Sequence, residues 1–506
     1  MTATAEKKTP DRLSAKHTQG RLRTGMRAVP LRRVRARFDS AATTEDNRRH
    51  WANADALSAD AAANAEVRRT LRNRARYEVA NNSYARGIIL TLANDTIGTG
   101  PRLQVLSGDD AANREIEREF DLWADEVSLA EKLRTMRMAR CQDGEAFALL
   151  VNNPGVEHPV KLDLRLTEAD MVTSPFGNLF DTQGVDGIHL DQYGNPTLYH
   201  VLKEHPGGSA WSFPDDFDDV PAQSMIHVFR QERPGQHRGI PEITPALPLF
   251  AQLRRFTLAV LAAAEAAADF AGILYTDAPA NGEAEQVEPM DSIELERNML
   301  MTMPGGWKMS QIEPMQPATT YAEFKKEILN EIARCLNMPF NVAAGNSSGY
   351  NYASGRLDHQ VYYKSIRVDQ DFIAARILDR ILSAWLWEYV LLRRGYGRQA
   401  LAMDVWEGLP AHQWFWDGQE HVDPAKEANA QETRLKSNTT TLAREYAKQG
   451  LDWESELRQR AKEKTLMREL GLEDLPAAQQ TGVNDKPVPA GKVNDGAGND
   501  SDSGDE

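Results

Sequence analysis

Apolar residues recur at three- and four-residue steps over much of the chain, and this spacing predicts a mostly helical protein. In 321–338 the apolar positions are Tyr321, Phe324, Ile328, Ile332 and Leu336. Pro339 ends this predicted helix, because proline removes a backbone donor and clashes with the preceding turn. Further predicted helices cover 59–98 with possible breaks at 81–83, 111–141, 241–272 beyond Pro245, and about 353–393.

Alternation of apolar and polar residues predicts strands in the first half of the chain. The alternating or strand-like segments are 145–151 and 160–166. Residues 187–202 have two alternating arms around a Tyr-Gly-Asn-Pro turn, which is typical of a hairpin. A further short strand is expected within 98–106. These strands, together with the flanking helices, predict a mixed α+β region in the first half of the chain.

One segment, AAGNSSGYNYASGR at 343–356, interrupts the helical pattern. Glycine, serine and asparagine at this density break helices. Three glycines and no proline predict a mobile loop rather than a stiff one, because Gly345, Gly349 and Gly355 widen the accessible backbone conformations.

The last third of the chain is predicted to contain shorter helices. Asp423 and Pro424 fit an N-cap followed by the first helical position, and Asp452 can cap a second helix. Gly450 and Gly471 fit helix C-terminal stops. From about 472 on, Gly, Asp, Asn, Pro and Ser dominate, which predicts a disordered tail.

The net charge of −15 is unevenly distributed. Residues 1–40 carry eleven basic and three acidic side chains, a net charge of +8, so the remainder carries −23. Such an acidic body repels a phosphate backbone, which argues against tight wrapping of DNA by the folded part. The basic arm, 1–45, either binds nucleic acid or another acidic partner, or is a flexible solvated segment. Its densest basic cluster comprises Arg32, Arg33, Arg35 and Arg37.

Several classes of protein are disfavoured by composition and motifs. Cys141 and Cys335 are far apart, which argues against a disulfide framework or a zinc site and fits a reducing cytosol. The apolar run 256–275 contains Glu265 and Asp269, so a packed helix of a soluble protein is expected rather than a membrane span. Phosphate-loop, HExxH, EF-hand and CxxC motifs do not occur in the sequence. Although eleven scattered histidines leave a catalytic triad open, we predict no enzyme, no metal and no cofactor.

Two patterns have more than one interpretation. Six of the ten tryptophans lie in the last third of the chain, where they form either a base-stacking platform or packing contacts among helices. The alanine run at 262–268 allows helices to approach closely. It suits either contact with copies of the same chain or burial inside one large domain.

Five segments together resemble the lambda-like family of tailed-phage portal proteins. They are LRNRARYEVANNSYARGIILTLANDTIGTGPRLQ (71–104), GIHLDQYGNPTLYH (187–200), IHVFRQERPGQHRGIPEITPAL (226–247), NYASGRLDHQVYY (351–363), and HVDPAKEANA with EYAKQGLDWE (421–454). Within them, Arg233-Pro-Gly-Gln236 and Arg238-Gly239-Ile-Pro241 are the most specific. The segments follow the family's order and span roughly 60–470.

The resemblance implies a mostly α, α+β portal fold that forms a ring, usually of twelve subunits, around a channel for double-stranded DNA. It divides the chain into a basic arm (1–45), an α+β wing (46–240), a stem helix (241–272), a clip (273–320), a second stem helix (321–340), a tunnel loop (341–356), a long wing helix (357–394), a helical crown (395–471) and a disordered acidic tail (472–506).

The resemblance also implies partners and a location. The channel would serve DNA packaging and ejection at one capsid vertex of the virion, after assembly in the host cytoplasm and without a membrane. The terminase large subunit would dock on the clip, and the major capsid protein and head-tail connector proteins would bind elsewhere. The alternative is a helical scaffold or adaptor protein that binds nucleic acid through its basic arm and forms no channel.

Two sets of residues are candidates for contact with the DNA. The predicted tunnel loop would present Asn346, Ser347, Ser348, Gly349, Tyr350, Asn351 and Tyr352. Glu265 and Asp269 lie four positions apart, on one helical face, and are candidates for an acidic channel wall. A competing interpretation pairs them with Arg254 or Arg255 of a neighbouring stem helix.

Overall fold

The computed structural model describes residues 44–45, 48–174, 184–208, 216–269, 273–276, 307–310, 318–349, 351–395, 408–418 and 424–472. The chain forms two compact units, 1–56 and 57–506. In the first unit, a backbone bond from Arg48 to Thr44 closes a turn. The arginines predicted to form the basic cluster, Arg32 to Arg37, lie outside the described residues, as does 473–506. The remaining paragraphs concern the second unit.

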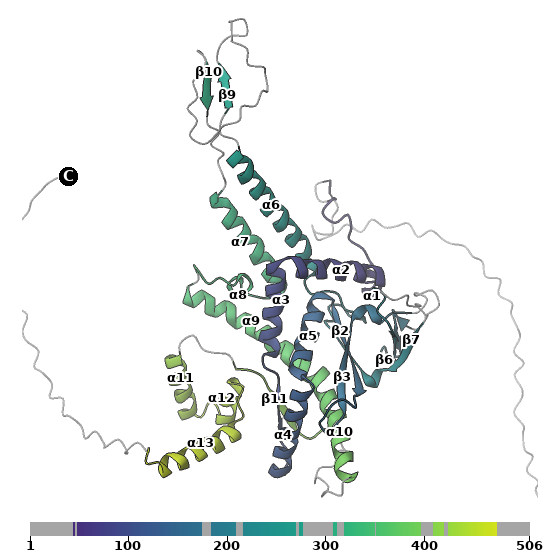
Figure 1. Cartoon of the computed structure of the whole chain (residues 1–506), viewed down its shortest axis with the longest axis vertical. Coiled ribbons are helices and arrows are strands. Elements are labelled where there is room, and N and C mark those ends of the chain that lie inside the picture. The colour runs from purple at the N-terminus through teal and green to yellow at the C-terminus, as the bar shows by residue number, and fades with distance from the viewer. Residues whose placement is uncertain are drawn as a thin grey trace, which may run out of the picture. The chain divides into compact units, whose positions relative to one another are not determined.

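Five helices open this unit (Figure 1). They are α1 (Ala59–Ala62), α2 (Ala65–Asn81), α3 (Ser83–Ile97), α4 (Asp110–Glu126) and α5 (Leu129–Gln142). The break predicted at 81–83 is confirmed: Asn82 is extended, and its side chain accepts hydrogen bonds from the first turn of α3. The single helix predicted over 111–141 is wrong, because Ser128 adopts a left-handed conformation (φ 53°) and separates α4 from α5.

Two antiparallel sheets follow. In the first, β2 (Glu145–Asn152) lies between β3 (Leu162–Thr167) and β8 (Met225–Phe229). The second is a meander of β4 (Gly184–Val185), β5 (Ile188–Leu190), β6 (Pro196–Leu202) and β7 (Phe217–Pro221). Short 3₁₀ turns, η2 (Ala169–Met171) and η4 (Ala222–Ser224), border them. The predicted strands and hairpin are confirmed, and a shared apolar cluster containing Phe147 and Tyr199 joins the two sheets.

A third, two-stranded ladder joins distant parts of the chain. β1 (Arg102–Val105) pairs antiparallel with β11 (His412–Phe415). Beside this ladder, the core buries Trp123 and Trp385, and Trp414 packs against them with Phe120 between. For Trp385 and Trp414 the structure therefore shows packing among helices rather than an exposed stacking platform.

A pair of helices, α6 (Leu247–Asp269) and α7 (Ala318–Cys335), runs side by side away from the sheets (Figure 1). The 3₁₀ turn η5 (Thr244–Ala246) precedes α6, so the helix predicted beyond Pro245 begins at Leu247. Within 273–320, the structure describes two strands and the start of α7. The strands, β9 (Ile273–Thr276) and β10 (Trp307–Ser310), form an antiparallel pair. By length and composition, 244–265 is the one described stretch that could cross a membrane, and 22% of it is buried.

A long helical rod follows the short helix α8 (Phe340–Ala344). It consists of α9 (Tyr352–Ile373), one π-helical turn, η6 (Ala374–Leu378), and α10 (Asp379–Gly395). The long helix predicted at about 353–393 is confirmed. The loop predicted over 341–356 is too long, because 340–344 and 352–356 are helical. Asn351 caps α9, with Oδ1 accepting from the Ser354 backbone, and Gly355 therefore lies inside a helix.

The C-terminal helices are α11 (Pro424–Lys436), α12 (Leu442–Lys448) and α13 (Trp453–Glu469). Pro424 is the first residue of α11, and Asp452 accepts hydrogen bonds from Glu454 and Ser455 at the start of α13. Gly450 and Gly471 follow α12 and α13 with φ of 73° and 68°. These starts and stops are confirmed, whereas Asp423, the predicted N-cap before Pro424, lies outside the described residues.

Candidate functional site

The segment Arg233–Pro241 contributes Arg238 to a buried ion pair with Glu145. Arg238 donates two hydrogen bonds to Glu145 Oε1, at 2.6 and 3.1 Å, and the Arg238 Nη1 donates to the carbonyl of Val172. Both side chains are almost fully buried. Burial raises the pKa of Glu145, but Arg238 and a hydrogen bond from His227 outweigh it and hold the pKa well below its usual range. The pair fixes the loop after β8 to the start of β2.

The backbone at Gly144 packs so closely against the backbone at Gly239 and Ile240 that glycine is required at 144 and 239. Gly144 has φ 92°, and a Cβ there would lie 2.5 Å from the carbonyl carbon of Ile240. A Cβ on Gly239 would lie 2.1 Å from the Gly144 carbonyl oxygen. Gln236 closes the loop, since its amide donates to the Arg238 carbonyl and accepts from the backbone of Glu232. The Arg-Gly-Ile-Pro segment is therefore a tight structural junction.

Three arginines at four-residue spacing on α2 face the same region. Arg68 pairs with Asp186, Arg72 with Asp170, and Arg76 with Asp143, Glu168 and Asp170. This row was not predicted from the sequence, although arginine at i, i+4 and i+8 of a predicted helix is a visible signal. The row ties α2 to the loops beside both sheets.

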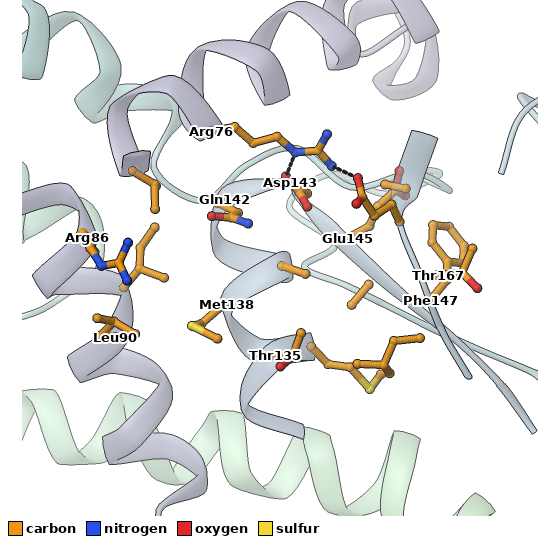
Figure 2. Close-up of a pocket in the computed structure, with 18 residues that line it drawn as sticks. Arg76, Arg86, Leu90, Thr135, Met138, Gln142, Asp143, Glu145, Phe147 and Thr167 are labelled. Atoms are coloured by element: carbon orange, nitrogen blue, oxygen red, sulfur yellow. Dashed lines mark hydrogen bonds and ion pairs between the residues drawn. The ribbon is translucent and has the colours of Figure 1, made fainter. Parts of the chain in front are cut away.

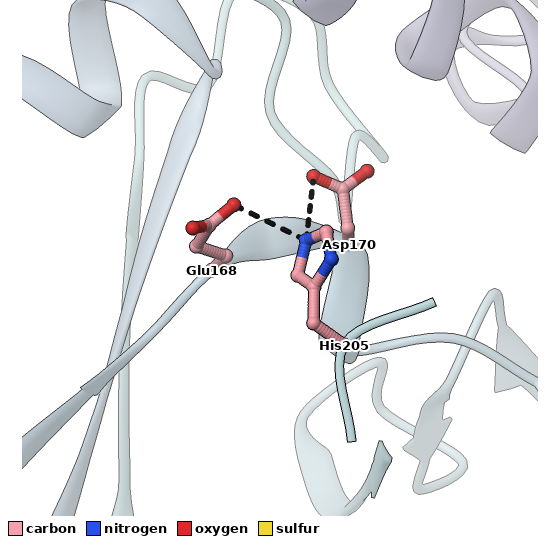
Figure 3. Close-up of side chains that lie close together, drawn as sticks. All are labelled: Glu168, Asp170 and His205. Carbon is pink, nitrogen blue, oxygen red and sulfur yellow. Dashed lines mark ion pairs between the residues drawn. The ribbon is translucent and has the colours of Figure 1, made fainter. Parts of the chain in front are cut away.

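Glu168, Asp170 and His205 form the group of possible metal ligands found among the described residues (Figure 3). His205 Nε2 lies 3.3 Å from Glu168 and 3.9 Å from Asp170. The same carboxylates already contact Arg76, at 3.1 and 2.8 Å, and Arg72 contacts Asp170 at 2.6 Å. Because two guanidinium groups neutralise the carboxylates, this group is a poor site for a divalent cation.

A pocket of about 440 Å³ lies between α2, α3, α5 and the first sheet (Figure 2). Leu90 and Met138 are among its apolar walls, and Arg76, bonded to Asp143, and Arg86 supply charge. Figure 2 shows these side chains around the space, without a nucleophile paired to a base among the labelled residues. Apolar walls beside two arginine side chains are a lining suited to binding a ligand.

A second buried charge cluster lies at the base of α6. Glu242 accepts from Arg137 at 2.9 Å and from Arg140 at 2.8 Å, and both arginines also contact Asp369 of α9. Burial raises the pKa of Glu242, but Arg137 and Arg140 lower it to about 2. This cluster connects the start of α6 with the long helical rod through α5. Nearby, burial raises the pKa of the Cys335 thiol to about 11, which makes that thiol a weak nucleophile.

Helix α6 contacts α2 and α7. Arg254 forms an ion pair with Glu78 of α2, and its guanidinium lies over the Tyr77 ring. Further along, Phe256 packs against Tyr321 and Phe324 of α7. Because Arg254 is engaged inside its own chain, Arg255, which is exposed, is the better placed of the two arginines for a contact with another copy.

Beyond Arg254, α6 also carries exposed apolar residues. Leu258 and Leu261 are 59% and 53% exposed. Glu265 is also exposed and lies seven positions after Leu258, so it shares their face. Asp269 is the last residue of α6, and its side chain is outside the described part. A similar exposed row on α9 consists of Leu357, Val361 and Val368.

The predicted tunnel loop is short in the structure. Its described irregular residues, 345–349 and 351, connect α8 to α9 and are exposed. Gly345 and Gly349 have φ of 63° and 81°, which glycine adopts readily. The Ser348 backbone donates to the Asn346 side chain at 2.9 Å. Tyr350 and the Tyr352 side chain lie outside the described residues.

Comparison with known proteins identifies the family. A model of the phage portal proteins of the lambda family matches residues 45–370. A probable portal protein of Halomonas phage phiHAP-1 is 24% identical over 412 residues, which cover 76% of this chain and 77% of that protein. Portal protein B of Escherichia phage lambda is 21% identical over 447 residues, which cover 78% of this chain and 83% of that protein.

A solved structure of the neck of a native gene transfer agent particle contains a chain with 14% sequence identity. The match covers 77% of this chain and 94% of that chain, with a TM-score of 0.44. The family match alone spans more than half of the sequence. This chain is a phage portal protein and belongs to the lambda family.

Proposed function

We propose that this portal protein forms a closed ring of about twelve copies at one capsid vertex of the virion. Double-stranded DNA would pass through the central channel during packaging and ejection. Family membership supports this proposal, and the exposed apolar face of α6 supports it independently. Solvent-exposed aliphatic side chains in a row on an ordered helix are typical of an interface with another protein.

In the ring, α6 and α7 form the stem, and the face with Leu258 and Leu261 packs against the adjacent copy. Glu265 shares that face. If this face lined the aqueous channel, both leucines would stay exposed to water, which is unfavourable. We therefore favour the interface for Glu265, where Arg255 of the adjacent copy is its partner. The acidic channel wall formed by Glu265 and Asp269 is the alternative outcome of the test given below.

The remaining assignments follow the order of the chain. Residues 46–240 form the wing, 273–320 the clip, 357–394 the long wing helix and 395–471 the crown. We propose that the terminase large subunit docks on the clip, and that head-tail connector proteins and the major capsid protein bind the assembled ring. Assembly takes place in the host cytoplasm, and ATP hydrolysis belongs to the terminase rather than to this chain.

The loop between α8 and α9 is proposed to face the DNA. Asn346, Ser347 and Ser348 are uncharged and exposed, so they offer weak contacts instead of fixed ion pairs with phosphates. Each such hydrogen bond contributes about 0.5–1.5 kcal/mol, which allows contacts to form and break as DNA advances.

Native mass spectrometry and negative-stain imaging of the purified full-length protein test the proposal. Closed rings of about twelve subunits are the expected result. A stable monomer at micromolar concentration across salt and pH contradicts the ring and favours the adaptor that binds nucleic acid through residues 1–45. ATP hydrolysis that copurifies with the ring and disappears on a substitution in this chain contradicts the structural role.

A further inference from the structure

We propose that His189 and His200 form a binding site for a divalent late-transition metal ion, with Zn²⁺ as the reference ion. The two residues lie on neighbouring strands, β5 and β6. Their Nε2 atoms face each other at 2.5 Å, and the ring planes are nearly perpendicular. Imidazole nitrogen is the commonest protein ligand for zinc, copper and nickel.

Strand register places this pair on one face of the second sheet. The His200 backbone donates to Gly187 across β5–β6, and His189 lies two positions after Gly187, so both imidazoles share a face. On the other side of His200, Asp219 is directly opposite across β6–β7. Neighbouring residues Tyr199 and Val201 point into the apolar core. The imidazole face is therefore the outer one.

Asp219 determines how His200 presents its nitrogen atoms. Its carboxylate lies 2.7 Å from His200 Nδ1 and only accepts hydrogen bonds, so Nδ1 carries the proton. In the neutral ring, the lone pair is then on Nε2, which faces His189. A carboxylate that orients a histidine through its second nitrogen is the usual outer partner of a metal-binding imidazole. The Phe217 ring packs edge-on against His200 at 4.9 Å and restricts its rotation.

The pair has the shape of a two-ligand site completed by water. A tetrahedral zinc ion at about 2.0–2.1 Å from each Nε2 places the two nitrogens about 3.3 Å apart, so the rings separate by about 0.8 Å from the present contact. Both imidazoles are partly exposed, and the His200 side chain is 13% exposed, which leaves room for bound water. Two imidazole nitrogens that face each other distinguish this site from the Glu168–Asp170–His205 group, where guanidinium groups take the place of the ion. The ion would tie β5 to β6 beside the irregular pairing after His189.

The test is zinc binding by the purified full-length chain, measured by equilibrium dialysis and by hydrogen exchange of 184–202. One ion per chain is expected, with slower exchange in 184–202. His189→Ala and His200→Ala each weaken binding at least about tenfold, because one of two ligands is lost, and Asp219→Ala weakens it about tenfold through the outer partner. Magnesium and calcium do not compete, because they prefer oxygen ligands.

His205→Ala is the matched control, since it removes another partly exposed imidazole from the same α+β region. It leaves zinc affinity unchanged if the proposal is right. His189→Gln and His200→Gln replace the alanine variants if those do not fold, as judged by circular dichroism. Absence of zinc binding at about 100 µM by the folded chain overturns the proposal. Binding that survives both His189 and His200 substitutions, or that is lost in His205→Ala alone, also overturns it.

Discussion

Arg140 and Glu242 form a fully buried ion pair, with Nε donating to Oε1 at 2.8 Å. Glu242 lies five residues before α6, and Arg140 is in the last turn of α5. Arg140 Nη2 also donates to both oxygens of Asp369, at 2.8 Å each. The pair therefore holds the start of α6 and the long rod in one arrangement.

Glu242→Gln is expected to destabilise the fold by about 3–5 kcal/mol, because it leaves Arg137 and Arg140 buried with a single carboxylate. Urea unfolding followed by tryptophan fluorescence measures the loss, since Trp123 and Trp385 lie in the core. Glu331→Gln, at an exposed position of α7, is the matched control and changes stability by less than about 0.5 kcal/mol. Equal midpoints for the two variants would contradict the prediction.

The same carboxylate predicts that the stability of the fold depends on pH in the acidic range. The pKa of Glu242 falls from its ordinary value of 4.5 to about 2 in the fold, because Arg137 and Arg140 outweigh the effect of burial. A lowered pKa stabilises the folded state above pH 4.5, and this contribution is lost as the pH falls from 4.5 to 2. Stability measured across this window is expected to fall more steeply for the native chain than for Glu242→Gln.

Glu117 predicts a dependence of stability on pH with the opposite sign. Burial raises its pKa to about 7, and the nearby carboxylates of Asp452 and Asp121 add to the shift. Its proton therefore stabilises the fold below pH 4.5, and this contribution is lost as the pH rises through 7. Glu117→Gln keeps an acceptor for the Val105 backbone and is expected to gain stability relative to the native chain at pH 8 but not at pH 4. A stability difference between Glu117→Gln and the native chain that is the same at pH 4 and pH 8 would refute the raised pKa of Glu117.

Glycine substitutions test the junction at Arg233–Pro241. Gly144→Ala is expected to destabilise by at least about 2 kcal/mol, because the new Cβ meets backbone atoms and the φ is positive. Gly87→Ala is the control. Gly87 lies within α3, where a Cβ meets no atom within 4 Å, so alanine is expected to stabilise by about 0.5–1 kcal/mol. Thermal unfolding of both variants measures the contrast.

Charge reversal on α6 distinguishes an interface from a channel wall. Glu265→Lys with Asp269→Lys is expected to reduce the yield of closed rings, as is Arg255→Glu. Combining Arg255→Glu with Glu265→Arg restores ring formation if the two residues meet across the interface. Glu157→Lys, at an exposed loop position, leaves rings unchanged. Intact rings with slower DNA passage in the double lysine variant would instead assign both acids to the channel wall.

Shortening the loop before α9 tests its contact with DNA. Deleting 346–349 keeps the Asn351 cap of α9, so ring assembly is expected to remain normal while fewer heads are filled with DNA. Replacing 346–349 with Gly-Ser-Gly-Ser retains the length and serves as the control. Normal filling by the deleted portal would rule out the DNA contact and make the segment an ordinary surface loop.

Features that depend on local sequence were predictable. The break at 81–83, the cap at Asp452 and the glycine stops at 450 and 471 arise from residues within one helical turn of each helix end. The Ser128 break was missed, although Ser128 and Glu131 have the spacing of a helix start. The loop predicted over 341–356 is too long because Asn351 caps α9 and Gly355 is accommodated within that helix.

Contacts between distant residues were beyond sequence reasoning. Arg238 and Glu145 are 93 positions apart, and Arg140 and Asp369 are 229 positions apart. Nothing in a single sequence selects these partners among the many arginines and carboxylates of the chain. Arg238-Gly239-Ile-Pro241 stood out only through its resemblance to portal proteins, and the structure supplies the physical reason in the buried pair and the glycine contact.

The β1–β11 ladder has a consequence for synthesis. Its strands are separated by about 300 residues, and the chain emerges from the ribosome at about 5–20 residues per second. For roughly 15–60 seconds, the nascent Arg102–Val105 strand therefore waits without its partner. During that time an unpaired edge is open to other chains, so the risk of misassembly is greatest before the last hundred residues are made.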